Sequence, residues 1–371
     1  MKNKNVILSN IYSVLLPVII ALFIGGIIIA AIGENPFLTY QVMIQKSLFS
    51  AKGILKTLHF AAPLILTGLA IAITFKANIF NMGVEGAAVL GAFFTGVVGF
   101  SLKGVNPVLH VTLCLLTGML VGIIFTLIPA VLKAYFKVNE MVVTLMLNYV
   151  VAEVVKFLAQ GIFKDPASGY VSTYAIAESA MFKKLFNSDL TLFFFIALLV
   201  FGILYVIFKK SKLGFEITAI GKNPEFAEAA GMNVAKKIVV IMLISGAVSG
   251  LAGAGFLMSE KYRFTLDFSG SPGLGWDGML IALLGNHSPI GVFVASVFYA
   301  ALKTGSEYIG LFTNVPKDIV GVIQGILILC LSVKFVSRNT GLMGRWTQWL
   351  GKIRSKRENA MSVDGREGEQ G

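Results

Sequence analysis

The sequence predicts an all-α, polytopic transmembrane bundle of about ten passes, some of them broken or re-entrant. Hydrophobic residues make up 56% of the 371 residues and charged residues only 13%, whereas soluble domains carry about 25% charged residues. Apolar stretches near the length of about 20 residues that crosses a bilayer recur along the whole chain. Lysine and arginine gather in particular segments between these stretches, and such segments stay on the cytoplasmic side.

Polar segments separate the predicted spans and alternate between the two sides of the membrane. Lys2 and Lys4 hold the N-terminus in the cytoplasm, and a basic run from residue 334 holds the C-terminus there. The predicted external loops include residues 34–56, 164–189 and 260–274. The predicted spans are residues 11–33, 57–75, 83–102, 107–132, 141–163, 190–208 and 238–259, two short helices within 276–302, and residues 318–333.

Single residues mark how individual spans bend, end and pair. Pro63 is expected to kink the second span. Lys133 and Lys137 close the fourth span on the cytoplasmic side. Glu153 and Lys156 stand three residues apart in the fifth span, a spacing that lets them pair on one helix face.

A polar turn divides the region that follows the seventh span. The sequence Asn286-His287-Ser288-Pro289 interrupts residues 276–302, so we expect two short helices there, the eighth and ninth passes. Residues 1–337 then form one transmembrane domain. Residues 338–371 form a cytoplasmic tail that is basic at first and then has the composition of a disordered segment.

A charged segment over residues 211–236 lies between two spans and offers a cytoplasmic surface to a partner. Its middle has the pattern of a short helix, with a capping residue and a proline at the start, acidic residues in the first turns, and a glycine at the end. We expect this helix over residues 224–230. It is either a docking helix or an ordinary solvated connector. The residues that define it are Asn223, Pro224, Glu225, Glu228 and Gly231.

Small residues fill the span that follows this segment. Gly246 and Gly250 form a G-x-x-x-G motif, and Gly253 continues the series. Because glycines allow two helix backbones to approach closely, we expect tight helix packing here.

Three polar residues form a candidate functional site within the membrane region. Asn81 and Glu85 belong to residues 80–86, a polar segment between two spans whose backbone must be covered by protein or face a cavity. Glu85 is a functional candidate because it is ionisable and close to the bilayer, or else it lies in water at the membrane edge. Asn148, inside the fifth span, either joins helices by a hydrogen bond or contacts a bound solute.

Several kinds of chemistry have no matching motif. The chain lacks the G-x-x-x-x-G-K-[ST] sequence, so it has no P-loop for ATP. Residues 273–278 match G-x-G-x-x-G, but a broken apolar run follows them, and the glycines are better suited to let the chain re-enter the membrane. The three histidines lack metal-ligand spacing, and the two cysteines lie far apart in apolar runs. We therefore expect no catalytic residue, metal or cofactor, and we attribute the net charge of +12 to cytoplasmic retention, not to nucleic-acid binding.

Together these segments resemble the membrane subunits of bacterial ABC importers in the branched-chain amino acid, ribose and simple-sugar permease family, most of all its nucleoside-type branch. The resemblance covers about residues 11–336. Two positions depart from the family pattern. Ala87 stands where glutamine is usual, and the E-A-A-G run that ends at Gly231 lacks the longer spacing of the general importer loop. The segments that carry the resemblance are residues 63–86, 138–150, 221–234 and 275–291.

The resemblance implies a permease subunit in the bacterial plasma membrane that carries a nucleoside or a related sugar-containing compound. It implies three partners: a separate ATPase subunit docked on residues 221–234, a second related permease subunit, often of a different type, and an extracytoplasmic substrate-binding lipoprotein. Asn81, Glu85 and Asn148 are then candidates for the solute path. The alternative is a secondary transporter driven by an ion gradient, for which Glu85 and Glu153 are the candidate coupling groups.

Overall fold

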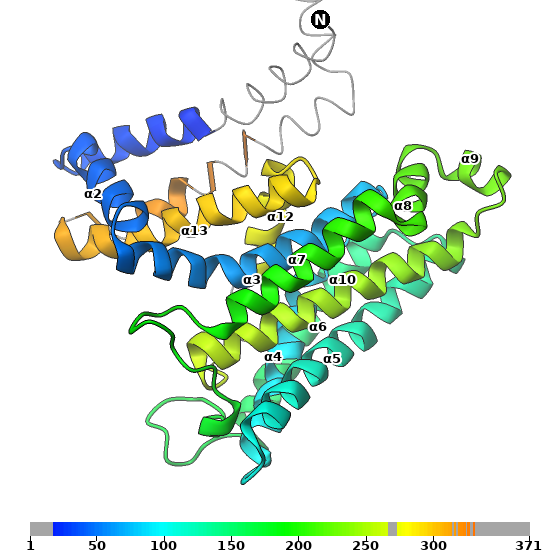
Figure 1. The fold of residues 1–371 in the computed structure, drawn as a ribbon, viewed down its shortest axis with the longest axis horizontal. Coiled ribbons are helices and arrows are strands. Elements are labelled where there is room, and N and C mark those ends of the chain that lie inside the picture. Colours follow the sequence, from blue (N-terminus) through cyan, green and yellow to red (C-terminus); the bar gives the residue numbers. More distant parts are fainter. Residues whose placement is uncertain are drawn as a thin grey trace, which may run out of the picture. The chain divides into compact units, whose positions relative to one another are not determined.

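Long apolar helices make up most of the described chain (Figure 1). The computed structural model describes residues 18–265 and 273–330, apart from residues 314, 317, 324, 327 and 328. Gly26–Val320 form one compact unit, and the described residues outside that range belong to a second unit.

In the part of the chain that the structure describes, seven helices are long and apolar enough to cross a membrane. They are α3 (Ala51–Lys76), α4 (Val84–Ser101), α5 (Pro107–Phe136), α6 (Glu140–Gln160), α7 (Leu192–Lys210), α10 (Val234–Phe256, continued by the π-helix η2, Leu257–Lys261) and α13 (Pro289–Phe312). Except for α13, these helices have bounds within six residues of the predicted spans.

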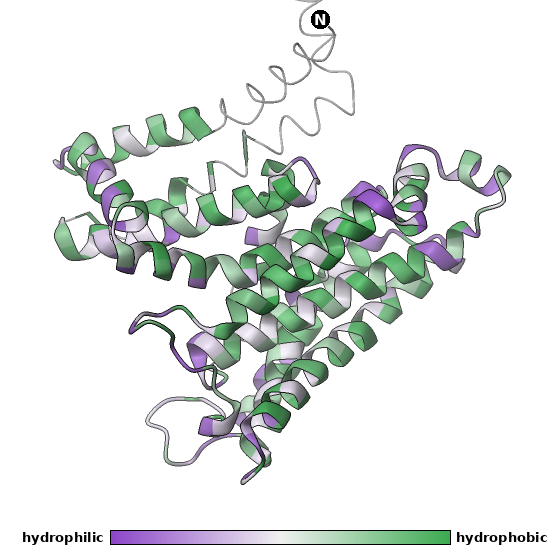
Figure 2. Cartoon of the chain, in the orientation of Figure 1, coloured by the Kyte–Doolittle hydropathy of each residue, from purple (hydrophilic) through white to green (hydrophobic). Residues whose placement is uncertain are grey.

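Shorter helices connect or flank the long ones. Figure 2 shows hydrophobic residues along the long helices, whereas hydrophilic residues gather around α8 and α9 and in the loops. The shorter elements are Val18–Ala31, α2 (Pro36–Leu48), the 3-10 turn η1 (Glu178–Ala180), α8 (Lys212–Lys222), α9 (Pro224–Ala229) and α12 (Leu274–Leu284).

The first and last predicted spans are described only in part. The first is helical from Val18 to Ala31, and residues 318–333 are described no further than residue 330. The tail over residues 338–371 lies outside the described residues, as do Lys2 and Lys4. The total of about ten passes and the cytoplasmic termini therefore stay predictions.

The core is built around α3. Its apolar span is 94% buried, compared with 17% for α6 and 28% for both α5 and α7. Helices α2, α7, α10, α12 and α13 all pack against α3, and α10 also packs against α4 and α5. Helix α3 is therefore central, and α5, α6 and α7 have few fully buried residues.

Glycines let α10 lie directly against the backbones of α4 and α5. A Cβ atom added to Gly246 or Gly250 would clash with the carbonyl oxygen of Gly122 or Gly118, respectively. At Gly253 it would clash with the carbonyl oxygen of Ala88. The small-residue series thus forms a seam on which three helices meet.

Two sequence predictions are wrong about local structure. Residues 34–56 are not simply a loop, because Asn35 caps α2 by accepting hydrogen bonds from the N–H groups of Phe37 (3.0 Å) and Leu38 (3.3 Å). Residues 276–302 break at the expected turn, but only α12 is short. Helix α13 continues to Phe312 and is long enough to span the membrane. Lys303 and Glu307 interrupt its apolar sequence, so its end was not recognised from composition.

Candidate functional site

The break between α3 and α4 covers residues 77–83. Three side chains of α6 hold this break and the first turn of α4. These side chains follow one another at intervals of four residues, so they line one face of the helix. They satisfy backbone groups that the break removes from helical hydrogen bonding, which membrane-embedded backbone requires. The Phe80 N–H donates to Glu140 Oε1 (3.1 Å), and the Met82 N–H donates to Thr144 Oγ1 (3.1 Å). The Gly86 N–H donates to Asn148 Oδ1 (3.0 Å), and Asn148 Nδ2 donates to the Met82 carbonyl (2.9 Å).

Glu140 and Thr144 were not among the residues predicted from sequence, although their spacing from Asn148 was a usable signal. Glu140 is 5% exposed and also pairs with Lys133 Nζ of α5 at 2.7 Å. The charge of this buried carboxylate is thereby compensated, and the start of α6 is fixed to the end of α5.

Asn81 joins the break to two further helices. Its side chain is fully buried, and its Nδ2 donates to Ser245 Oγ of α10 at 3.1 Å. Ser245 in turn donates to the carbonyl oxygen of Ala70 in α3 at 2.8 Å. The same asparagine accepts a hydrogen bond from the N–H of Gly83 at 3.0 Å, which fixes the turn itself.

Glu85 joins the first turn of α4 to the start of α12. It is 4% exposed, so it is buried and not in water. One carboxylate oxygen accepts the N–H of Gly273 at 2.9 Å, and the other accepts the N–H of Gly275. A Cβ atom on Gly275 would clash with the backbone of Glu85. Gly275, the second glycine of the G-x-G-x-x-G sequence, therefore permits this close approach.

The structure thus brings Asn81, Glu85 and Asn148 to one place, the break between α3 and α4 and the first turn of α4. The hydrogen bonds described for all three connect parts of the same chain. Their direct effect is to fix the conformation of the break and its position between α6, α10 and α12.

The segment over residues 211–236 contains two helices, α8 and α9, of which the sequence predicted only the second (Figure 1). Helix α9 begins at Pro224, where Asn223 Oδ1 accepts the N–H of Phe226 at 2.9 Å. It ends at Ala229, one residue before the predicted end. Gly231 has φ of +84°, a conformation that favours glycine.

Helix α8 connects this segment to the core. A Cβ atom on Gly221 would clash with the carbonyl oxygen of Lys76, the last residue of α3. Glu216 of α8, which is 4% exposed, pairs with Lys237 Nζ of α10 at 2.6 Å. Helix α8 is therefore packed on the end of α3 that leads directly into the break.

The outer surface of α8 and α9 carries two large aromatic side chains. Phe215 is 66% exposed and Phe226 is 71% exposed. Glu225 and Glu228, beside Phe226, are exposed as well. A short capped helix thus exposes one aromatic side chain and two carboxylates.

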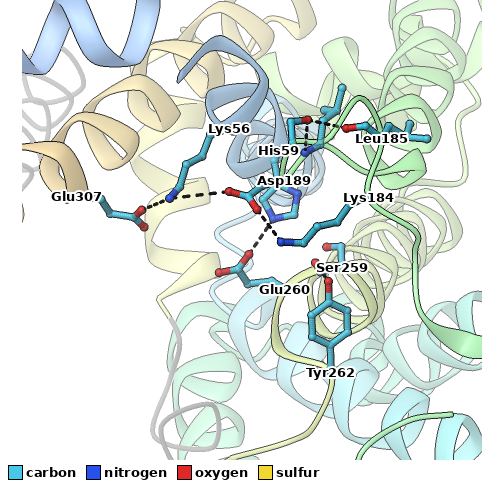
Figure 3. A network of polar contacts seen from close by, with 11 residues as sticks. Lys56, His59, Lys184, Leu185, Asp189, Ser259, Glu260, Tyr262 and Glu307 are labelled. Atoms are coloured by element: carbon cyan, nitrogen blue, oxygen red, sulfur yellow. Dashed lines mark hydrogen bonds and ion pairs between the residues drawn. The ribbon is translucent and has the colours of Figure 1, made fainter. Parts of the chain in front are cut away.

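A network of charged side chains lies at the opposite ends of α3 and α10 (Figure 3). His59 Nε2 pairs with Glu260 at 2.8 Å, and Lys56 lies between Glu307 and Asp189. Beside them is a depression of about 330 Å³. It is lined by Lys52, Lys56, Lys184, Asn187, Ser188, Asp189 and Tyr308.

Lys184 and Asp189 form an ion pair in the loop that borders this depression. Lys184 Nζ donates to Asp189 Oδ1 at 2.7 Å. This hydrogen bond lowers the pKa of Asp189 and raises the pKa of Lys184 from their ordinary values. Both groups are therefore charged over the whole physiological pH range.

Comparison with known proteins shows which family the chain matches. Residues 53–332 match the family model described as branched-chain amino acid transport system / permease component. The chain is 32% identical to the nucleoside ABC transporter permease protein NupB of Lactococcus lactis, over 87% of this chain and 92% of the relative. It is also 32% identical to the guanosine ABC transporter permease protein NupP of Bacillus subtilis, over 89% of this chain and 95% of the relative.

A third relative carries a different solute in its name. The glucose ABC transporter permease protein TsgB13 of Haloferax volcanii is 31% identical over 85% of each chain. No solved structure gives a significant match to the sequence.

Proposed function

The chain belongs to the family of branched-chain amino acid transport system permease components, and on this premise we propose that it is the permease subunit of an ATP-driven importer of nucleosides. It is a multi-pass membrane protein that moves a solute and carries out no covalent chemistry. A separate ATPase subunit supplies the energy, a second permease subunit completes the membrane channel, and an extracytoplasmic binding protein delivers the solute.

The observation that carries the proposal is the physical connection between the α8–α9 segment and the helix break. Helix α9 is short, so it is marginally stable alone, and its side-chain cap and its attachment to α8 give it a fixed shape. With Phe226, Glu225 and Glu228 all exposed, it is suited to enter a groove on the ATPase.

Movement of the ATPase would reach the membrane region through α8. Gly221 of α8 lies against Lys76, the last residue of α3, and the break begins at the next residue, Ala77. Glu85 then connects the break to α12. A displacement of α8 would therefore shift the end of α3, the break and the start of α12 together.

The solute path is proposed to run beside the break, near Asn81, Glu85 and Asn148. Irregular backbone at membrane depth is tolerated where protein covers it or where it borders a cavity. At the other end of α3, the charged depression beside Lys56 and Asp189 is suited to receive the solute-loaded binding protein.

The names of two relatives favour a nucleoside, and the third names glucose. The complete transporter in proteoliposomes, with binding protein outside and ATP inside, should take up guanosine without any ion gradient. Glucose at the same concentration should enter much more slowly than guanosine and should not inhibit guanosine uptake. Uptake that needs a sodium or proton gradient and ignores ATP would favour the alternative, a secondary transporter, and would overturn the proposal.

A further inference from the structure

Asp277 is an acidic residue that takes no part in the hydrogen bonds of the helix break. It lies in the first turn of α12, within the G-x-G-x-x-G sequence. One carboxylate oxygen, Oδ1, accepts a hydrogen bond from the hydroxyl group of Tyr299 in α13. In the part of the chain that the structure describes, no residue donates a hydrogen bond to the other oxygen, Oδ2, and Asp277 is partly exposed.

The depth of this carboxylate in the membrane makes its second oxygen significant. Its partner Tyr299 stands ten residues after Pro289, the first residue of α13, and thirteen residues before Phe312, the last. At a rise of about 1.5 Å per residue, Tyr299 is about 15 Å from one end of the span and about 20 Å from the other. An ionisable side chain at such depth is unfavourable against lipid and almost always faces protein or water.

Glu85 and Glu140 provide a contrast, because both oxygens of each carboxylate have partners in the chain. One oxygen of Glu85 accepts the N–H of Gly273, and the other accepts the N–H of Gly275. Glu140 uses one oxygen for a backbone N–H of the break and the other for a lysine of α5. The fold uses these two carboxylates fully, whereas Asp277 keeps an oxygen that a bound molecule can contact.

A row of polar side chains leads from Asp277 to the depression beside Lys56. On α13, Tyr299, Lys303 and Glu307 follow one another at intervals of four residues, so they line one face of the helix. Lys303 Nζ lies over an aromatic ring of α3, 5.2 Å from its centre. Glu307 pairs with Lys56, which lines the depression (Figure 3). A small solute that leaves the depression along α13 would therefore meet a polar group at each turn before it reaches Asp277.

We propose that Asp277 binds the solute within the membrane by accepting hydrogen bonds from the ribose hydroxyl groups of a nucleoside, an inference that rests on the function proposed above. A hydrogen bond from a hydroxyl group to a charged oxygen is about twice as strong as one between neutral groups. One available oxygen suits hydroxyl donors, whereas the paired N–H donors of a guanine base match both oxygens of a carboxylate.

Tyr299 and Lys303 support this contact without touching the solute. Tyr299 is a positioning residue, because its hydroxyl group holds Oδ1 of Asp277 and leaves Oδ2 for the solute. Lys303 supplies a nearby positive charge that partly offsets the charge of the carboxylate.

Uptake of two nucleosides by the complete transporter tests the proposal. Guanosine has both ring hydroxyl groups of ribose, and 2′,3′-dideoxyguanosine has neither. Asp277→Asn should lower the ratio of guanosine uptake to dideoxyguanosine uptake by about 10-fold, the loss expected for a hydrogen bond to a charged group. Because the binding protein is the same in every assay, a change in this ratio arises in the permease. Asp318→Asn makes the same chemical change at an exposed position and should leave the ratio unchanged.

Tyr299→Phe provides a second variant if Asp277→Asn does not assemble. It removes only the hydroxyl group that holds Oδ1 and should lower the same ratio severalfold. If the pair only joins α12 to α13, uptake of both nucleosides should fall to the same extent. An unchanged ratio in whichever variant reaches normal membrane abundance would overturn the solute contact. The ratio can be measured whether ATP or an ion gradient drives uptake, so this proposal and the proposed function fail separately.

Discussion

Asn148 of α6 and Gly86 of α4 are joined by a hydrogen bond of 3.0 Å, from the Gly86 N–H to the side-chain oxygen of Asn148. The amide nitrogen of the same side chain donates to the Met82 carbonyl at 2.9 Å. One side chain thus satisfies a donor and an acceptor of the interrupted backbone, at both ends of the turn that starts α4.

Asn148→Leu should destabilise the protein because it leaves both backbone groups buried without this partner. Each unsatisfied group costs about 1–3 kcal/mol. We expect a lower melting temperature in detergent and reduced uptake. The control is Met146→Leu, at an exposed position of the same helix. Equal melting temperatures for the two variants would show that the amide does not support the break.

Glu85→Gln should impair transport more than assembly. The substitution keeps the size of the side chain but removes one of the two oxygens that accept the N–H groups of Gly273 and Gly275. We expect normal membrane abundance and uptake lowered by about 10-fold or more, which corresponds to about 1.4 kcal/mol. Glu178→Gln, at an exposed position in η1, is the control and should transport normally. Normal uptake by Glu85→Gln would remove Glu85 from the transport mechanism.

Gly250→Ala should disturb the seam between α10 and α5. The added methyl group meets the carbonyl oxygen of Gly118, and such overpacking costs about 1–3 kcal/mol. Gly202→Ala in α7 is a matched control, because a Cβ atom there has no neighbour within 4 Å. We expect a lower melting temperature only for Gly250→Ala. A loss of the same size in both variants would contradict the packing explanation, because Gly202 has free space and alanine favours a helix more than glycine does.

Six of the seven long helices could be predicted because their lengths and composition are set by the bilayer, which acts on each segment separately, whereas α13 was predicted too short. Helix α9 could also be predicted, because its cap and terminal glycine are local signals. Helices α2 and α8 were missed because each mixes polar residues with a narrow buried face, such as Thr39, Met43 and Ser47 in α2.

The partners of the candidate site could not be predicted for a different reason. Glu85 and Gly273 are 188 residues apart in sequence, and Asn81 and Ser245 are 164 apart. Periodicity and capping patterns describe short stretches, so they carry no information about which distant backbone a buried carboxylate meets. Only the spacing of Glu140, Thr144 and Asn148 was available as a local signal.

The ion pair between Lys184 and Asp189 predicts a defined pH dependence. Because Asp189 has a lowered pKa in the folded protein, its contribution to stability is complete above its ordinary pKa of 3.8 and is lost as pH falls through the lower folded value. The difference in melting temperature between the parent and Asp189→Asn should therefore be constant near neutral pH and shrink in acid below pH 3.8. A difference that grows on acidification would contradict this assignment.

Docking of the ATPase on the α8–α9 segment is tested most directly by the amount of ATPase that co-purifies with Gly231→Val. Valine strains the φ of +84° at this position, so the end of α9 should lose its shape while the spans remain intact. Gly104→Val is the control, with φ of +75° and no neighbour within 4 Å, in the connection between α4 and α5. We predict normal membrane abundance for both variants and a severalfold loss of co-purified ATPase for Gly231→Val alone. Undiminished ATPase binding by Gly231→Val would contradict the proposed coupling.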